Sequence, residues 1–203
     1  AASMFAWFFL SALYMQLVLG YDAMQVGLAF LPSNLIMAGC SLGLSAWVVM
    51  RFGICRTLGW GLLLAAVGLA LFALAPTEGR FVIHVLPGML LLGVGAGIAL
   101  NPLLLAAMGD VKPEDSGLAS GVVNTAFMMG GALGLAILAS LADARTDHLR
   151  QAGASVQQAL NAGYQLAFWV SALCALVAAG LGGFVLRPAS PPSAPAPSHP
   201  GAV

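Results

Sequence analysis

Residues 110–142 read DVKPEDSGLASGVVNTAFMMGGALGLAILASLA, and this stretch sets the fold class. A short charged loop runs directly into residues 116–142, which carry no charge. About 20 apolar residues in a helix are enough to cross the roughly 30 Å hydrocarbon core of a bilayer. The stretch therefore predicts a transmembrane helix. Its small residues, which are typical of close helix contacts in membranes, include Gly117, Gly121, Gly130 and Gly134.

The composition excludes a soluble fold. Hydrophobic residues make up 61% of the chain and charged residues 7%, against roughly 25% charged in a typical soluble domain. The seven basic and seven acidic residues cancel, so no nucleic-acid partner and no polybasic membrane-surface patch are expected. The cysteines and histidines are scattered, which predicts no metal site and no cofactor.

The charged residues divide the chain into six uncharged spans, each long enough to cross a bilayer. We predict an all-α, polytopic membrane helix bundle over residues 1–187. The six transmembrane helices are expected at residues 4–20, 25–50, 57–76, 82–109, 116–142 and 164–186. Residues 188–203 are rich in Pro, Ser and Ala, which predicts a disordered tail with no apolar face to bury.

Basic residues in the loops indicate the orientation of the helices. With both chain ends in the cytoplasm, the inner basic residues are Arg51, Arg56, Lys112 and Arg187, and the outer ones are Arg80, Arg145 and Arg150. The excess is four against three. We prefer this orientation, with a cytoplasmic tail, because the compact loops then face the cytoplasm.

Prolines and glycines inside the predicted helices mark kinks and close contacts. Pro32 leaves a carbonyl unpaired, which a neighbouring helix or a side chain such as Ser33 or Asn34 must satisfy. Such kinks occur both beside substrate paths and in plain packing, and the sequence leaves both open. Pro102 marks a second kink. Small residues four apart predict packing faces at 39 and 43, Gly93 and Gly97, Gly117 and Gly121, and Gly130 and Gly134.

Four stretches together carry a family resemblance: VLGYDAMQVGLAFLPS (18–33), RFG (51–53), VLPGMLLLGVGAG (85–97) and PEDSGLASGVVNTAFMMGGALGLAILA (113–139). They resemble the C-terminal part of a major facilitator superfamily transporter. More narrowly, they resemble the fourteen-helix drug/proton antiporters of the EmrB/QacA type. The resemblance covers residues 4–187, and the last stretch is its most specific part.

The resemblance implies one half of a bundle around a central cavity, built from two three-helix repeats of inverted topology. Alternating access would come from rocking against a second half that this chain does not contain. The residues matching the family's cytoplasmic loops are Arg51, Gly53, Arg56, Pro113, Glu114 and Asp115. Met50 stands where the family's loop signature has an acid, and the antiporter motif of the first half is absent.

Proton coupling usually needs a titratable side chain within the membrane. No Asp, Glu, Lys or Arg lies within the six predicted helices. His84 lies close to Arg80, which favours an interfacial histidine over a proton carrier. We expect the coupling proton to bind in the missing N-terminal half.

Polar and flexible side chains inside the helices are candidates for a substrate path. The candidates are Gln16, Asn34, Asn101, Asn124, Thr125, Phe127 and Met128. An amide in a membrane needs a partner or a water-filled space, so hydrogen bonding between helices is the alternative. Aromatic and methionine surfaces suit binders of varied apolar molecules, and they equally suit packed or lipid-facing surfaces.

We predict part of a secondary active transporter in a bacterial cytoplasmic membrane, exporting hydrophobic or cationic drugs by proton-coupled alternating access. Its partners are the lipid bilayer and a small-molecule substrate. An enzyme is not expected, because no nucleophile with a base and no metal ligands are grouped inside the helices. The alternative is a truncated or non-transporting integral membrane protein that needs its missing N-terminal half.

Overall fold

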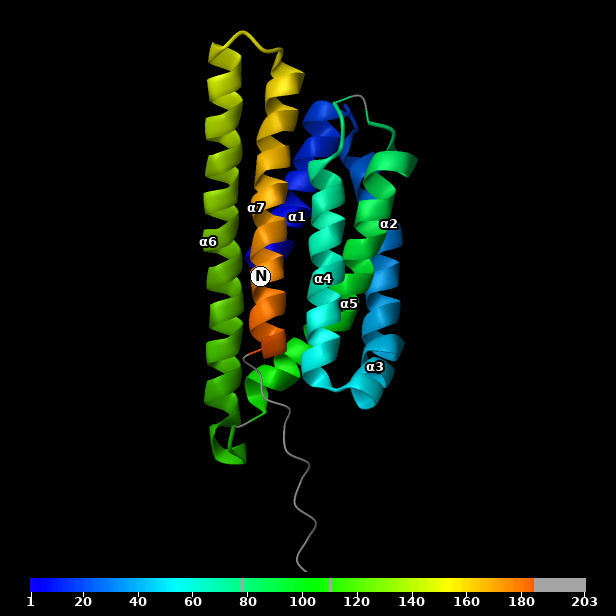
Figure 1. Ribbon diagram of the computed structural model, residues 1–203, viewed down its shortest axis with the longest axis vertical. Coiled ribbons are helices and arrows are strands. Elements are labelled where there is room, and N and C mark those ends of the chain that lie inside the picture. Colours follow the sequence, from blue (N-terminus) through cyan, green and yellow to red (C-terminus); the bar gives the residue numbers. More distant parts are fainter. Residues whose placement is uncertain (78, 110, 185–203) are drawn as a thin grey trace, which may run out of the picture.

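The computed structural model describes residues 1–77, 79–109 and 111–184, and these fold into helices joined by short connections (Figure 1). The predicted tail at 188–203 and the basic residue Arg187 lie outside the described residues. The elements are α1 (Ala2–Leu13), η1 (Tyr14–Val18), α2 (Ala23–Gly39), η2 (Cys40–Leu44), α3 (Ser45–Phe52), α4 (Ile54–Ala73), η3 (Phe81–Val85), α5 (Leu86–Met108), η4 (Pro113–Asp115), α6 (Ser116–Gln151) and α7 (Val156–Phe184). The predicted all-α membrane helix bundle is confirmed.

Five continuous helical stretches are long and apolar enough to cross a membrane: Ala23–Phe52, Ile54–Ala73, Phe81–Met108, Pro113–Gln151 and Val156–Gly182. A sixth apolar helix, Ala2–Val18, is shorter. Three of these stretches contain or begin with a π-helical segment, namely η1, η2 and η3. A π-turn bonds each N–H five residues back, and such segments often mark functional positions.

The two long helices at the C-terminal end extend further than the hydropathy pattern indicates. The sequence predicts helices that end at residue 142 and begin again at 164, whereas α6 continues to Gln151 and α7 begins at Val156. Charges mark where a segment leaves the apolar layer. A helix satisfies its own backbone groups in water as well as in lipid, so it does not end there.

Chain reversals are made by residues with the required local geometry. Gly53 is the C-cap of α3 and also the N-cap of α4. Its φ of +82° is a backbone conformation that residues with a side chain rarely adopt. The hydroxyl of Thr57 then donates to the Gly53 carbonyl at 2.7 Å. At the start of α2, Asp22 and Gln25 form a capping box, each side chain accepting from the other's backbone N–H.

In chain order the helices form two groups of three. The first group runs from α1 to α4 and the second from η3 to α7, and helices of the two groups contact each other. α4 packs against both α5 and α7, and α6 packs against α7. In addition α2 packs against α5, while α6 packs against α1 (Figure 1). Thus α2, which begins the second helix of the first group, contacts α5 in the first helix of the second group. In the same way α6, the second helix of the second group, contacts α1, the first helix of the first group.

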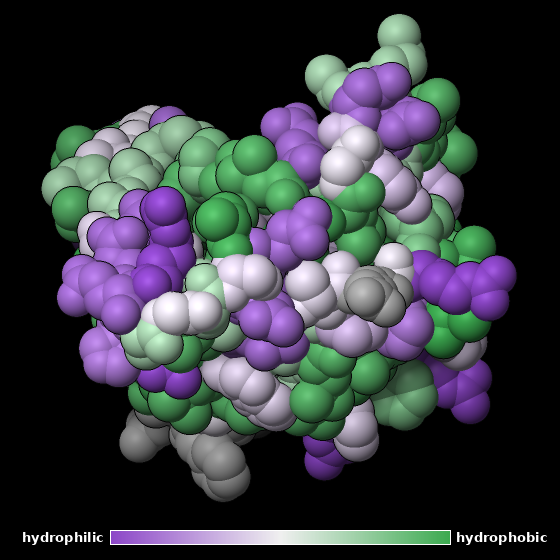
Figure 2. Space-filling view, turned by 90° about the horizontal axis from the view of Figure 1, so that it is seen from above, coloured by the Kyte–Doolittle hydropathy of each residue, from purple (hydrophilic) through white to green (hydrophobic). Residues whose placement is uncertain are grey.

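The buried core lies among α1, α4, α5 and α7. It contains large side chains, including Trp7, Tyr14, Phe72, Met89 and Phe168. Many other large apolar side chains are exposed around the bundle, as a lipid-facing surface requires. Viewed from the α6–α7 connection, hydrophilic side chains form separate patches among apolar ones (Figure 2).

Glycines bring α5 into direct backbone contact with two neighbours. A Cβ at Gly93 would lie 2.6 Å from the Ser33 carbonyl oxygen of α2, and a Cβ at Gly97 would lie 2.6 Å from that of Met37. Gly95 points the opposite way, toward α4. The run 93–97 therefore packs α5 between α2 and α4.

The other predicted glycine pairs divide into packed and open ones. Gly134 lies directly against Ala2 of α1, and Gly130 lies near Ala1. Around Gly117 and Gly121, by contrast, no described atom beyond the neighbouring backbone of the same helix lies within 4 Å of where a Cβ would stand, and the same holds at 39 and 43. At these four glycines, therefore, no close contact with another described helix is made.

Candidate functional site

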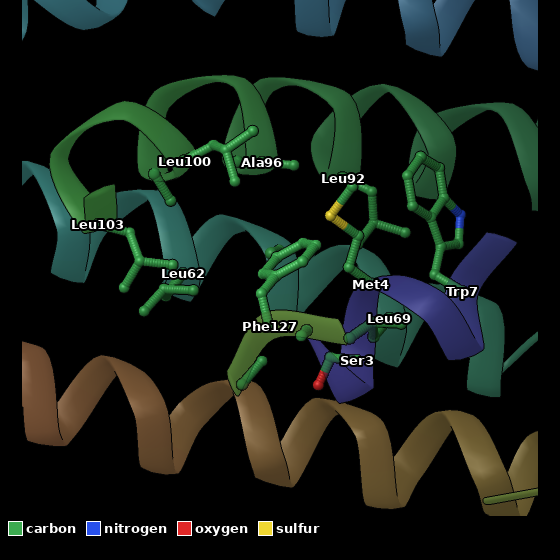
Figure 3. Close-up of a pocket in the computed structure, with 15 residues that line it drawn as sticks. Ser3, Met4, Trp7, Leu62, Leu69, Leu92, Ala96, Leu100, Leu103 and Phe127 are labelled. Carbon is green, nitrogen blue, oxygen red and sulfur yellow. The ribbon is translucent and has the colours of Figure 1, made fainter. Parts of the chain in front are cut away.

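An apolar cavity of about 90 Å³ lies among α1, α4, α5, α6 and α7 (Figure 3). Its lining includes Met4, Leu62, Leu92 and Phe127, and a single hydroxyl residue, Ser3. Phe127 is the sequence-predicted path residue that lines it, and its ring meets that of Phe5 edge-on at 5.9 Å between centroids. Walls of this kind suit an apolar group, and none of the lining side chains is charged.

Trp7 also borders the cavity, but its polar atom does not equip it for a ligand. The side chain is 1% exposed, and its indole N–H has no acceptor among the described residues. Figure 3 shows the nitrogen on the side of the ring turned away from Phe127. The ring packs against Phe8, with centroids 4.3 Å apart, so we assign Trp7 to packing.

The first half of α6 presents polar side chains outward. Asn124, Thr125 and Met128 are all exposed. The Thr125 hydroxyl donates to the Gly121 carbonyl of its own helix at 2.8 Å, whereas no described residue hydrogen-bonds the Asn124 amide. An unpaired amide is costly in hydrocarbon. This face of α6 therefore suits water or another protein surface better than lipid.

The remaining predicted path residues lie elsewhere. Gln16 is exposed on η1, and Asn34 is half-buried on α2. Neither lines the cavity. Asn101 is engaged in a helix contact, because its Nδ2 donates to the Ser41 carbonyl at 2.8 Å. Near Pro32, the Ser33 hydroxyl donates to the Phe30 carbonyl at 2.9 Å. The carbonyl that Pro32 leaves without its usual donor is that of Leu28, four residues back, so this bond is not the one that the sequence predicts.

A polar cluster that the sequence does not single out binds the connection between α4 and η3. The Ala75 carbonyl accepts from Gln165 Nε2 at 2.8 Å and from Asn161 Nδ2 at 3.3 Å. The Pro76 carbonyl accepts from the Tyr14 hydroxyl at 2.8 Å. We call these three side chains the loop clamp. The signal in the sequence was two amides spaced four residues apart. The expected helix start near Tyr164 placed Gln165 inside a helix but left Asn161 outside it.

The residues that match the family's loops are exposed. Arg51 and Arg56 flank the turn at Gly53, and the Arg51 guanidinium lies 5.5 Å from the centroid of the Trp47 ring. No ion pair joins either arginine to an acid within the described residues. Pro113, Glu114 and Asp115 form the short helix η4 before α6.

These features define a multi-pass membrane protein built from closely packed helices. The chain belongs to the Major Facilitator Superfamily, whose family model matches residues 1–135. This superfamily consists of membrane transporters, so the prediction that the chain is not an enzyme is confirmed at the level of the family.

Several bacterial proteins are similar to the chain. It is 34% identical over 171 residues to the puromycin resistance protein pur8 of Streptomyces alboniger, covering 81% of this chain and 34% of that protein. It is 34% identical over 140 residues to the cephamycin export protein CmcT of Amycolatopsis lactamdurans, covering 69% and 29% respectively. A lincomycin resistance protein of Streptomyces lincolnensis is 34% identical over 135 residues, covering 66% and 27%. The matched part thus spans about a third of each relative or less.

Proposed function

We propose that the chain is the C-terminal six-helix part of a secondary transporter that exports hydrophobic or cationic compounds from bacteria. The observation that carries this proposal is its 34% identity to three proteins named for antibiotic export or resistance. Puromycin, cephamycin and lincomycin differ chemically, so the similarity favours a shared transport fold over a shared substrate. The resemblance at 113–139 supports the fourteen-helix drug/proton antiporter type.

We further propose that the chain works by alternating access. The contacts of α2 with α5 and of α6 with α1 relate the two groups of three helices symmetrically, which supports a pair of three-helix repeats. Such a half would rock against a second six-helix half, around a site near the middle of the membrane. The coupling proton would bind in that second half, and the C-terminus would face the cytoplasm.

The exposed face of α6 is our candidate for the substrate path. The Asn124 amide there has no hydrogen-bond partner within the described residues, and Phe127, one turn further along, places an aromatic ring at the apolar cavity. Together they would present a polar group and an apolar wall to one substrate. Gln16 and Asn34 remain candidates on neighbouring helices, while the Asn101 amide is already used.

The test is export of a panel of dyes and antibiotics from cells that express the full coding sequence of the gene. Asn124→Leu is compared with Ser140→Leu, a matched change at another exposed polar position of α6. We expect Asn124→Leu to lose export while membrane insertion is unchanged, and Ser140→Leu to keep it. No export by the unaltered protein across the panel would overturn the efflux assignment. Full export by Asn124→Leu would remove this residue from the path.

A further inference from the structure

Two interruptions of helix geometry face each other across the contact of α2 and α5. The stretch Ala23–Phe52 contains the π-helical segment η2. Opposite it, α5 contains Pro102, which is buried. Each interruption leaves a carbonyl oxygen without its usual α-helical donor, and each is repaired by side chains from the other helix.

A side chain of α3 replaces the hydrogen bond that Pro102 removes from α5. Pro102 has no N–H, so the Ile98 carbonyl four residues back receives no bond from it. The hydroxyl of Ser45 donates to that carbonyl at 3.3 Å. Ser45 is 1% exposed, so no water competes for the bond.

The π-segment is repaired from α5. In η2 the N–H of Ser45 bonds the Cys40 carbonyl, five residues back, so it does not bond the carbonyl of Ser41. Asn101 Nδ2 donates to that Ser41 carbonyl at 2.8 Å and lies 3.1 Å from the Ser41 hydroxyl oxygen. The residue that repairs the π-turn therefore stands next to the proline.

The helices are close enough for these bonds because of the glycines beside them. Gly97 stands one turn before Asn101 and brings α5 against the Met37 carbonyl and the Cys40 side chain. The same close approach leaves little room for the two helices to slide independently. Any change at η2 must therefore alter its bonds to α5.

We propose that Ser41, Ser45 and Asn101 form a conformational latch, which holds η2 in the π form against Pro102. When the latch opens, residues 40–44 relax to an α-helix. A π-turn contains one residue more than an α-turn. Converting it to an α-turn rotates the helix beyond it by about 100° and shifts that helix by about 1.5 Å. This rotation turns α3 and the loop carrying Arg51 and Arg56. Its place in a transport cycle rests on the proposed function, but the latch itself does not.

The experiment measures the distance between two spin labels, at Met50 on α3 and Trp60 on α4. Both side chains are exposed. The protein is expressed from its full coding sequence, with its other cysteines replaced, and held in lipid nanodiscs. A 100° turn of α3 moves a surface label by roughly 8 Å, given a helix diameter of about 10–12 Å. We expect a single distance in the parent protein and a second, displaced population in Asn101→Leu.

A double-mutant cycle tests the chemistry of the latch. Ser45→Ala should raise the displaced population about 5- to 10-fold, the effect of losing one buried hydrogen bond. Pro102→Ala restores an N–H for Ile98, so Ser45→Ala should then change the population less than about 2-fold. Ser171→Ala is the matched control, because that buried hydroxyl bonds only its own helix, at the Ala167 carbonyl.

Three outcomes would overturn the latch: an unchanged distance in Asn101→Leu, an equal effect of Ser45→Ala with and without Pro102, or an equal shift in Ser171→Ala. None of these measurements needs a substrate. A protein that shows the displaced population but exports nothing therefore retains the latch and loses the efflux assignment. A protein that exports its substrate but shows no displaced population in any variant retains the efflux assignment and refutes the latch.

Discussion

Replacing Gly95 with alanine should force α4 and α5 apart. An added Cβ would lie 2.6 Å from both the Ala65 nitrogen and the Gly61 carbonyl oxygen of α4. Ordinary van der Waals contact begins at 3.4 Å, and both neighbours are backbone atoms that cannot rotate away. The two helices must therefore separate by about 0.8 Å, the difference between those distances.

The energetic cost follows from this separation. A gap of about 0.5–1 Å removes roughly a quarter to a half of the dispersion attraction between facing atoms, and overpacking typically costs about 1–3 kcal/mol. Alanine offsets part of this, because it favours a helix over glycine by up to about 1 kcal/mol. We expect Gly95→Ala to lower the free energy of unfolding by about 1–2 kcal/mol.

The measurement is unfolding in mixed micelles with increasing SDS, followed by tryptophan fluorescence. Gly180→Ala on α7 is the matched control, because no described atom beyond the neighbouring backbone of α7 lies within 4 Å of its Cβ position. Only the gain in helix propensity should act there, so its midpoint should equal or exceed that of the parent. If Gly95→Ala unfolds at the parent's midpoint, the close backbone contact is not energetically significant and the reasoning fails.

Three further changes test other contacts. Gln165→Leu removes the shorter bond to Ala75, which should increase the maleimide labelling rate of a cysteine at Thr77 about 5-fold; an unchanged rate would mean that the loop clamp does not hold the connection. Phe127→Ala should reduce export of bulky aromatic compounds more than export of small cations, which parallel efflux assays would measure. Asp22→Ala removes a helix cap and should cost about 1 kcal/mol in the same SDS unfolding assay.

The sequence could indicate that each charge-free run is helical, because such runs partition into lipid, but it could not give the ends of α6 and α7, which extend beyond their runs. The direction in which each glycine faces could not be predicted either, since Gly93 and Gly95 differ by two residues and point to different helices. Hydropathy treats them alike. Their roles depend on which helices lie on either side of α5, and that is set by the whole bundle.

For the candidate site, too, the sequence could predict some features and not others. The sequence indicates that Asn101 needs a partner, and the structure supplies Ser41, which is 60 residues away in the chain. The Ser41 carbonyl is available to Asn101 because η2 adopts a π-turn. The residue types at 40–44 do not predict that π-turn. Asn124 is the opposite case, since its amide remains unbonded within the described residues. For this residue the sequence left open a hydrogen bond between helices, and no such bond is present within the described residues.

The loop clamp also bears on the order in which the protein is made. Gln165 follows Ala75 by 90 residues, and at about 5–20 residues per second the ribosome needs roughly 5–20 s to cover that interval. During this time α4 and α5 can already pair, but the Ala75 carbonyl lacks both of its donors from α7, Asn161 and Gln165. The hairpin reaches its final state when α7 enters the membrane. A chain that stalls before α7 would therefore expose this connection, which gives cellular proteases a site on unfinished molecules that finished ones lack.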